Sequence, residues 1–411
     1  MALIQIIQRR TIPKISNIEI GLMIFFLWYY IIPSATSLNF MMVLGVALLY
    51  LFYGIQQVPV RYAKEVGKVL LCALIIAACY WLFTDTATIH KSVSMYQLKR
   101  YLSKFQQVAF GFFPIFLFAR LMCAGTRQQK QMIAVTIAAL LVYTLTQTWQ
   151  ELVTNQMAAR SWANFAAMNE KNVGTYSFVY AISALIPVLM IMIFNTKDLG
   201  VKTLLSVAMT AIFTFLLYAQ YTLSVLLAIV SIAVFIWMNS ENTVLKTIFV
   251  LLIPFAFVAL PPGLRLIANK VDSIQISIRL NELATALSGG DLGYNLGGRL
   301  ELYSRAIQAF FRSPILGNRK LDFDGHATLF TILADVGLLG GIPYYYLYFS
   351  CKQRINTLLG DLKQCRQFAP VFIMFILLGA TNPIHSAMPL YTVIWLLAPL
   401  VINLTNIDTV Y

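Results

Sequence analysis

The chain has 411 residues, of which 59% are hydrophobic and only 11% are charged, and its mean hydropathy is +0.75. Soluble domains carry roughly a quarter of charged residues. These values therefore exclude a water-soluble globular enzyme, and also a disordered or fibrous chain. The formal net charge is +14. In a membrane protein such an excess flanks the spans and faces anionic lipid, so it does not predict binding to nucleic acid.

Long apolar stretches recur from Ile18 to Leu404, and their lengths suit membrane-spanning helices of about 20 residues. We expect an all-α, polytopic integral membrane protein with about 12 transmembrane helices. The predicted spans, in chain order, are 18–33, 38–56, 66–84, 105–123, 131–149, 174–195, 201–219, 222–238, 243–260, 326–349, 368–382 and 388–405. The basic N-terminal residues before the first apolar run predict a first membrane anchor rather than a cleaved signal peptide.

Lys and Arg in short loops predict the orientation, because cytoplasmic loops carry an excess of these residues. With both termini in the cytoplasm, most of them fall on the inner side. Four tyrosines (Tyr344, Tyr345, Tyr346 and Tyr348) are then expected in the inner aromatic belt. The residues on the predicted inner side are Arg9, Arg10, Lys14, Arg61, Lys64, Lys68, Arg120, Arg127, Lys130, Lys197, Lys202, Lys246, Lys352, Arg354, Lys363 and Arg366.

The long polar stretch 261–325 divides the chain into a membrane domain at 1–260, a large extracytoplasmic loop at 261–325 and a second membrane domain at 326–411. Within the loop we expect one helix at Ser277–Leu287 and a second that starts after Gly297-Gly298 and ends before Ser313-Pro314. The apolar stripe of the second helix comprises Leu300, Tyr303, Ile307 and Phe310. Residues 90–104 are expected to form an amphipathic helix on the outer surface.

Neither the cysteines nor the histidines have the spacing of a metal site, and no phosphate-cradling glycine loop occurs. We therefore expect no metal and no cofactor. The cysteines show no paired pattern and are expected to be free thiols. They are Cys72, Cys79, Cys123, Cys351 and Cys365.

Polar groups gather at the predicted outer face instead. Arg305 and Arg312 on the second loop helix are seven residues apart and share a face. Guanidinium groups bind phosphate bidentately, and a histidine at the membrane boundary can act as a base near neutral pH. The candidates on the two outer loops and at the start of the following span are Arg160, Lys171, Arg299, Arg305, Arg312, Asp322, Asp324 and His326.

Each candidate also has a structural interpretation. Glu301 and Arg305, four residues apart, could be a surface pair, and Arg312 could bind lipid headgroups. His326 could be a structural hydrogen-bonding group, and His385, in an outer turn, is a secondary candidate.

Within the tenth predicted span lies Asp335, a functional candidate because it is an intramembrane carboxylate, although it could equally lock a neighbouring helix. Gly337 and Gly341 have the spacing of close helix packing.

The segment from Gly298 to Gly341 resembles the O-antigen ligase and polymerase superfamily of bacterial envelope glycosyltransferases. In that family a loop helix with an Arg precedes a Pro-x-x-Gly element, which is Pro314 to Gly317 here. A His then opens a span, with a Gly eleven residues on and a small residue four further; His326, Gly337 and Gly341 fit this spacing.

Two features separate the branches of the superfamily. The ligase branch usually has Asn, Ser or Gln after the His, where this chain has Ala327. The polymerase (Wzy-type) branch has an Arg followed at about eleven or twelve residues by a Gly, and Arg305 to Gly317 has this spacing, whereas Arg160 to Gly174 is longer.

The resemblance implies a C-type glycosyltransferase-like helical fold in the bacterial cytoplasmic membrane, with an undecaprenyl-diphosphate-linked oligosaccharide as donor, membrane lipids around it and a chain-length regulator as a possible partner. Arg160, Arg299 and Arg305 would bind the diphosphate. His326 would deprotonate the attacking sugar hydroxyl, helped by Asp322 or Asp324. The expected activity is an O-antigen or capsule polymerase; the alternatives are an O-antigen ligase that transfers the glycan to lipid A–core, a transporter or flippase, and a structural subunit.

Overall fold

A computed structural model describes residues 14–38, 40–57, 60–82, 104–160, 165–241, 243–271, 274–288, 293–318, 327–385 and 387–407. All regular structure in these ranges is helical, which confirms the all-α class. Seven helices in the described part of the chain are long and apolar enough to cross a membrane. Each of the twelve predicted spans overlaps a helix, but the count of twelve spans stays a prediction.

The helices follow the apolar segments closely at most boundaries. They are α2 (Asn17–Ile31), η1 (Pro33–Ser37), α3 (Phe40–Gln57), α4 (Val60–Leu82), α6 (Phe113–Ala124), α7 (Arg127–Thr154), η2 (Ala158–Arg160), α8 (Phe165–Glu170), α9 (Tyr176–Asn195), α10 (Leu199–Tyr218), α11 (Thr222–Asn239), α12 (Thr243–Ala268), α13 (Ile274–Leu287), α14 (Gly293–Arg312), α15 (Thr328–Leu359), α16 (Leu362–Thr381), α17 (Met388–Thr392), η3 (Val393–Leu397) and α18 (Ala398–Ile407). Residues 104–111 are also helical and lead into α6.

Two boundaries in the predicted loop differ from the expectation. Helix α12 continues through Pro261-Pro262-Gly263 to Ala268, because prolines are tolerated inside apolar membrane helices. Helix α14 begins at Gly293 and includes Gly297-Gly298, after which the sequence had predicted the helix to start. The predicted amphipathic helix at 90–104 lies outside the described residues except for Lys104.

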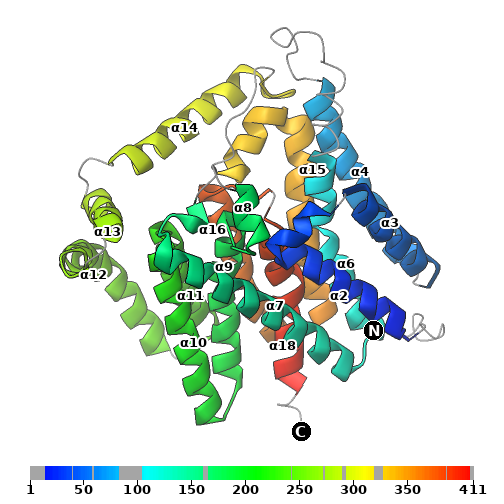
Figure 1. Cartoon of the computed structure of the whole chain (residues 1–411), viewed down its shortest axis with the longest axis horizontal. Helices are drawn as coiled ribbons and strands as arrows, with labels where there is room; N and C mark the ends of the chain where they lie inside the picture. Colours follow the sequence, from blue (N-terminus) through cyan, green and yellow to red (C-terminus); the bar gives the residue numbers. More distant parts are fainter. Residues whose placement is uncertain are drawn as a thin grey trace.

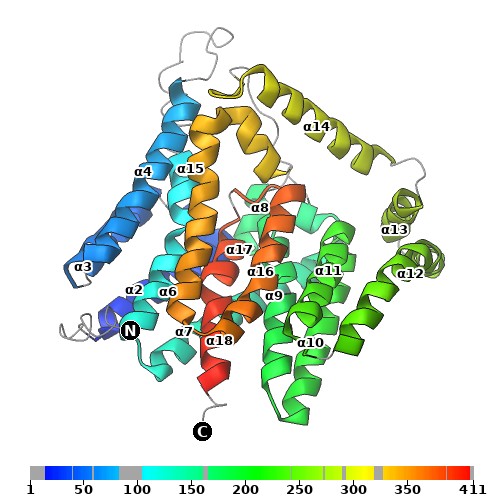
Figure 2. The same cartoon turned by 180° about the vertical axis from the view of Figure 1, so that it is seen from behind.

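The long helices form a bundle, with α14 running obliquely across one end of it (Figures 1 and 2). The C-terminus and the α15–α16 turn lie at the opposite end. In the segment Met388–Asn406, 78% of the most apolar stretch is buried inside the molecule, whereas in α10 the share is 17%. The α17–α18 segment is therefore the central helix, and α10 is peripheral.

Aromatic rings pack around this central segment. Trp395 is fully buried and contacts Phe112 and Phe375 at centroid distances of 6.3 and 5.1 Å. Tyr344 and Tyr348 are buried beside Tyr391, and the hydroxyl of Tyr348 donates to that of Tyr344. The expectation that these two tyrosines lie in an interfacial belt is therefore wrong, because their hydroxyls satisfy each other inside the bundle.

A buried ion pair joins α2 to α6. The Nε and Nη2 groups of Arg120 donate to the two carboxylate oxygens of Glu19 at 2.7 and 3.0 Å, and both side chains are 1% exposed. The hydroxyl of Tyr50 on α3 donates to the same carboxylate at 3.4 Å. Arg120 is one of the basic residues predicted on the inner side, and the structure shows it packed inside the bundle. It is buried because Glu19, far away in sequence, supplies the compensating charge.

Removal of one partner should strongly destabilise the fold, because the other charge would stay buried without its counter-charge. We expect Arg120→Ala or Glu19→Ala to lower the free energy of unfolding by about 3–5 kcal/mol. The apolar double variant Glu19→Leu/Arg120→Met should recover most of this loss. Thermal unfolding in detergent micelles measures both effects. Single variants as stable as the wild type would contradict the assignment.

Candidate functional site

Helix α15 is broken at Gly337. This residue has φ +58° and ψ −159°, outside the helical region, and the two arms of α15 meet there at an angle (Figures 1 and 2). Such a conformation is open to glycine and costly for other residues. Gly337 is therefore the point where the span changes direction, and it also allows a close approach of backbone, as the sequence predicted for a packing glycine.

The segment that follows α14, residues 313–318, fills this break, and we call it the docking segment. The Leu338 amide donates to the Pro314 carbonyl at 2.8 Å, and the Leu339 amide donates to the Ile315 carbonyl at 3.1 Å. In return the Asn318 amide donates to the carbonyl of Ala334 at 2.7 Å. Backbone groups released by the break thus find partners, as buried backbone must.

Two glycines make this close approach possible. A Cβ at Gly317, where φ is +76°, would lie 2.3 Å from the carbonyl oxygen of Asp335. A Cβ at Gly337 would lie 2.4 Å from the carbonyl oxygen of Ile315. Backbone meets backbone on both sides, so no side-chain movement can relieve either clash. The Pro-x-x-Gly element and the glycine of the following span thus lie against each other. We call this contact between residues 313–318 and the break at Gly337 the joint.

The joint fixes α14 to the short arm of α15, which comprises residues 328–336 before the break. Ala306 and Ala309 of α14 pack against Ala334 in a small buried cluster. Tyr303 also contacts Phe330 with ring centroids 5.8 Å apart. Because small side chains lie between the two helices, their axes can approach closely.

Two of the candidate arginines of α14, Arg305 and Arg312, are exposed. The side chain of Arg305 is 60% exposed, and its Nε lies 3.8 Å from Glu301 Oε1. At this distance and exposure the pair contributes little to stability, so the Arg305 guanidinium remains open to a ligand. Arg312 is exposed as well, and Arg299 belongs to the same helix.

Beneath the joint, titratable side chains from separate segments come together. The Tyr80 hydroxyl of α4 donates to Asp335 Oδ2 at 3.1 Å. The ammonium of Lys104 lies 4.7 Å from the centre of the Tyr80 ring. Asp335 thus contacts a neighbouring helix, and it also stands two residues before the break. Lys104 and Tyr80 were not singled out from the sequence, because only the fold brings them to Asp335.

The start of α15 is fixed to the turn between α16 and α17. The Thr328 amide donates to the Asn382 carbonyl at 3.2 Å, and the Ile384 amide donates to Thr328 Oγ1 at 2.8 Å. Ala327, with φ +78°, is fully buried at this point. Its predecessor His326, together with Asp322 and Asp324, lies outside the described residues.

His385 belongs to the same turn and is half-buried. Burial lowers the pKa of His385 to about 3, and the positive charge of Lys104 adds to this lowering. The imidazole is therefore neutral at physiological pH, so it can exchange hydrogen bonds with a polar ligand but adds no positive charge.

Arg160 and Lys171 make structural contacts on the other outer segment. The Arg160 Nη1 donates to the Gln220 carbonyl at 3.2 Å, and its guanidinium lies 5.4 Å from the centre of the Tyr221 ring. Lys171 pairs with Glu151 at 3.0 Å. The groups that hold these two side chains thus come from α7 and the α10–α11 turn.

No group of three or more potential metal ligands occurs in the described ranges. All five cysteines are unbridged, which confirms the expectation of free thiols. No known family model matches the chain, and no curated protein matches it.

The joint predicts a sharp sensitivity to added methyl groups. Gly317→Ala and Gly337→Ala should each lower the free energy of unfolding by more than about 2 kcal/mol, because each combines left-handed strain with a backbone clash. Gly67→Ala on α4, where a Cβ meets no atom within 4 Å, is the matched control and should be neutral or stabilising. Thermal unfolding of the three variants tests this, and equal effects would contradict it.

The lowered pKa of His385 predicts a pH dependence of stability. The unfolded imidazole binds a proton below about pH 6.5, whereas the folded one stays neutral until about pH 3. Stability from this group is therefore present above pH 6.5 and lost as the pH falls toward 3, with a slope of up to about 1.4 kcal/mol per pH unit. Unfolding temperatures measured across this range should depend less on pH in His385→Gln. An unchanged pH dependence would show that His385 titrates normally.

Proposed function

We propose that the chain is a metal-independent, lipid-diphosphate-dependent glycosyltransferase that polymerises oligosaccharide repeat units of an O-antigen or capsule. The donor is an undecaprenyl-diphosphate-linked oligosaccharide, and the reaction takes place at the outer face of the bacterial cytoplasmic membrane. The observation that supports this proposal is the joint. It holds α14, which carries Arg305, against the short arm of α15, and the candidate base His326 directly precedes that arm in the sequence.

The arginines supply the electrostatics of the reaction. A lipid diphosphate is its own leaving group, and its negative charge grows as the bond from the anomeric carbon to the phosphate oxygen breaks. Fixed guanidinium groups stabilise that charge more in the transition state than in the ground state. The exposed and loosely paired Arg305 is the first candidate, with Arg299 and Arg160 as further ones. Arg312 and Lys171 are secondary.

His326 acts as the general base in this proposal. A sugar hydroxyl of one unit attacks the anomeric carbon of the other, its proton passes to the imidazole, and the prenyl diphosphate leaves. General-base help of this kind is worth roughly 10²–10⁴-fold. Asp322 or Asp324 would orient the imidazole. His385 and Asp335 are secondary candidates near the start of the same span.

A lipid tail also needs a place between the spans. A groove of about 890 Å³ runs between α7 and α10. Of the seven candidate spans, α10 has the smallest buried share. The hydroxyl groups that line the groove donate to carbonyls of their own helix; Thr210 Oγ1, for example, donates to the Ser206 carbonyl at 3.0 Å. The groove therefore offers an apolar surface. Trp149 contacts Tyr218 at one end with ring centroids 5.3 Å apart. This groove suits a prenyl chain.

The proposed topology has twelve spans, both termini in the cytoplasm and an extracytoplasmic loop at 261–325 that covers the sugars. A ligase would share the donor and differ in the acceptor, lipid A–core. The broken span favours one further candidate, a carrier for lipid-linked sugars, because carriers often have discontinuous helices. In carriers, however, the broken ends coordinate the cargo, whereas here Leu338, Leu339 and Ala334 already bond to the docking segment.

The proposal is tested by incubating the purified protein with a synthetic prenyl-diphosphate repeat unit and separating the products on a gel. The wild type should produce a ladder of polymers without any other protein. His326→Ala should reduce chain growth by at least about 100-fold. Arg305→Lys should also lose most activity, since lysine keeps the charge but lacks the fork.

Arg279→Lys on α13 is the matched control, because Arg279 pairs with Glu282 at 3.0 Å and has no role in the proposal. It should retain the wild-type ladder. No ladder from the wild type, or full activity in His326→Ala, would refute the proposed chemistry. Uptake of the lipid-linked unit into vesicles without polymer would instead favour the carrier.

A further inference from the structure

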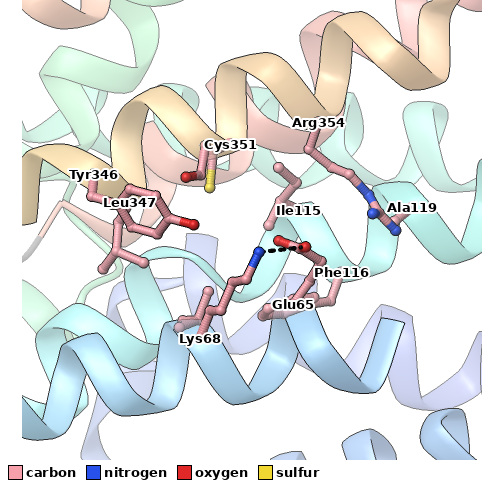
Figure 3. Close-up of a pocket in the computed structure, with 11 residues that line it drawn as sticks. Glu65, Lys68, Ile115, Phe116, Ala119, Tyr346, Leu347, Cys351 and Arg354 are labelled. Carbon is pink, nitrogen blue, oxygen red and sulfur yellow. Dashed lines mark hydrogen bonds and ion pairs between the residues drawn. The ribbon is translucent and has the colours of Figure 1, made fainter. Parts of the chain in front are cut away.

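A small pocket lies between α4, α6 and the long arm of α15, residues 338–359 (Figure 3). Its enclosed volume is about 30 Å³, which admits a water or one oxygen atom of a larger group. A ligand would therefore sit at its mouth and reach inward. The lining includes three charged residues, Glu65, Lys68 and Arg354.

The charges at this pocket favour an anion. Lys68 donates to Glu65 Oε1 at 3.0 Å, and the side chains of these residues are 45% and 30% exposed. Figure 3 shows the Tyr346 hydroxyl pointing toward the same space, while the guanidinium of Arg354 extends toward Ala119. Two cations and one carboxylate leave one excess positive charge. This excess matches a ligand with a single negative charge.

The surface beside the pocket is apolar. Leu71 and Leu74 of α4 are exposed within two turns of Lys68. Ile342 and Phe349 of α15 are exposed on either side of Tyr346. In a membrane protein these side chains face hydrocarbon. The side chains of Lys68 and Glu65 are partly exposed, and exposed charge is costly inside hydrocarbon. We therefore expect these charged groups at the level of a headgroup layer.

We propose that this pocket binds the phosphate of an anionic phospholipid. Lys68 and Arg354 contact the phosphate oxygens at the mouth, and the acyl chains run along Leu71, Leu74 and Ile342. Glu65 holds the Lys68 ammonium in place and keeps the site selective for singly charged headgroups. None of the residues that line the pocket has a role in the proposed chemistry, so the site does not depend on the proposed function.

The test uses full-length protein in bilayers of equal parts phosphatidylcholine and phosphatidylglycerol, with bound lipid counted by native mass spectrometry. The wild type should retain phosphatidylglycerol in preference to phosphatidylcholine. Lys68→Gln and Arg354→Gln should each weaken this retention about tenfold or more, because each removes a charge-assisted hydrogen bond. Lys363→Gln, which changes an exposed lysine outside the pocket, is the matched control and should retain the lipid.

A second measurement separates lipid binding from folding. In phosphatidylcholine alone, the wild type and the pocket variants should unfold at the same temperature. Added phosphatidylglycerol should raise the unfolding temperature of the wild type and of Lys363→Gln, since a ligand stabilises the state that it binds. The pocket variants should lose that rise. Equal retention by all variants, or equal retention of phosphatidylcholine by the wild type, would overturn the proposal.

Discussion

The docking segment and the break in α15 exchange backbone hydrogen bonds. The arrangement of α14 and the short arm of α15 depends on this exchange. A span that bends at Gly337 releases amide and carbonyl groups, and water cannot satisfy them inside a membrane. Residues 313–318 satisfy them instead. The position of α14 follows, because its last turn leads directly into those bonds. A loop helix that would otherwise be free is thereby held as part of the bundle.

This constraint also explains how distant residues gather at one place. Asp335 stands two residues before the break and is bonded to Tyr80 of α4, while Lys104 lies over the ring of that tyrosine. Thr328 ties the first turn of the same short arm to the α16–α17 turn, which carries His385. The short arm of α15 is thus attached on three sides, and one of these contacts is with α14, which carries the exposed Arg305.

The sequence predicted the helices well because a span is encoded by the sum of many apolar transfer energies, which single errors barely change. It also placed the end of α14 before Pro314, since a proline restricts its predecessor. The sequence did not predict the structural role of a residue where that role depends on a partner far away in the chain. The spacing of Gly337 predicted close packing but not the break in the span, and the inner-side position of Arg120 did not predict its burial against Glu19.

The most direct test of the central claim is a disulfide between α14 and the short arm of α15. In a variant that lacks the five native cysteines, Ala309→Cys and Ala334→Cys should cross-link almost completely under mild oxidation, because the two alanines belong to one buried cluster. If the docked arrangement is the working one, the cross-linked protein should still extend glycan chains. Absence of the cross-link in native membranes would contradict the joint on which this account rests.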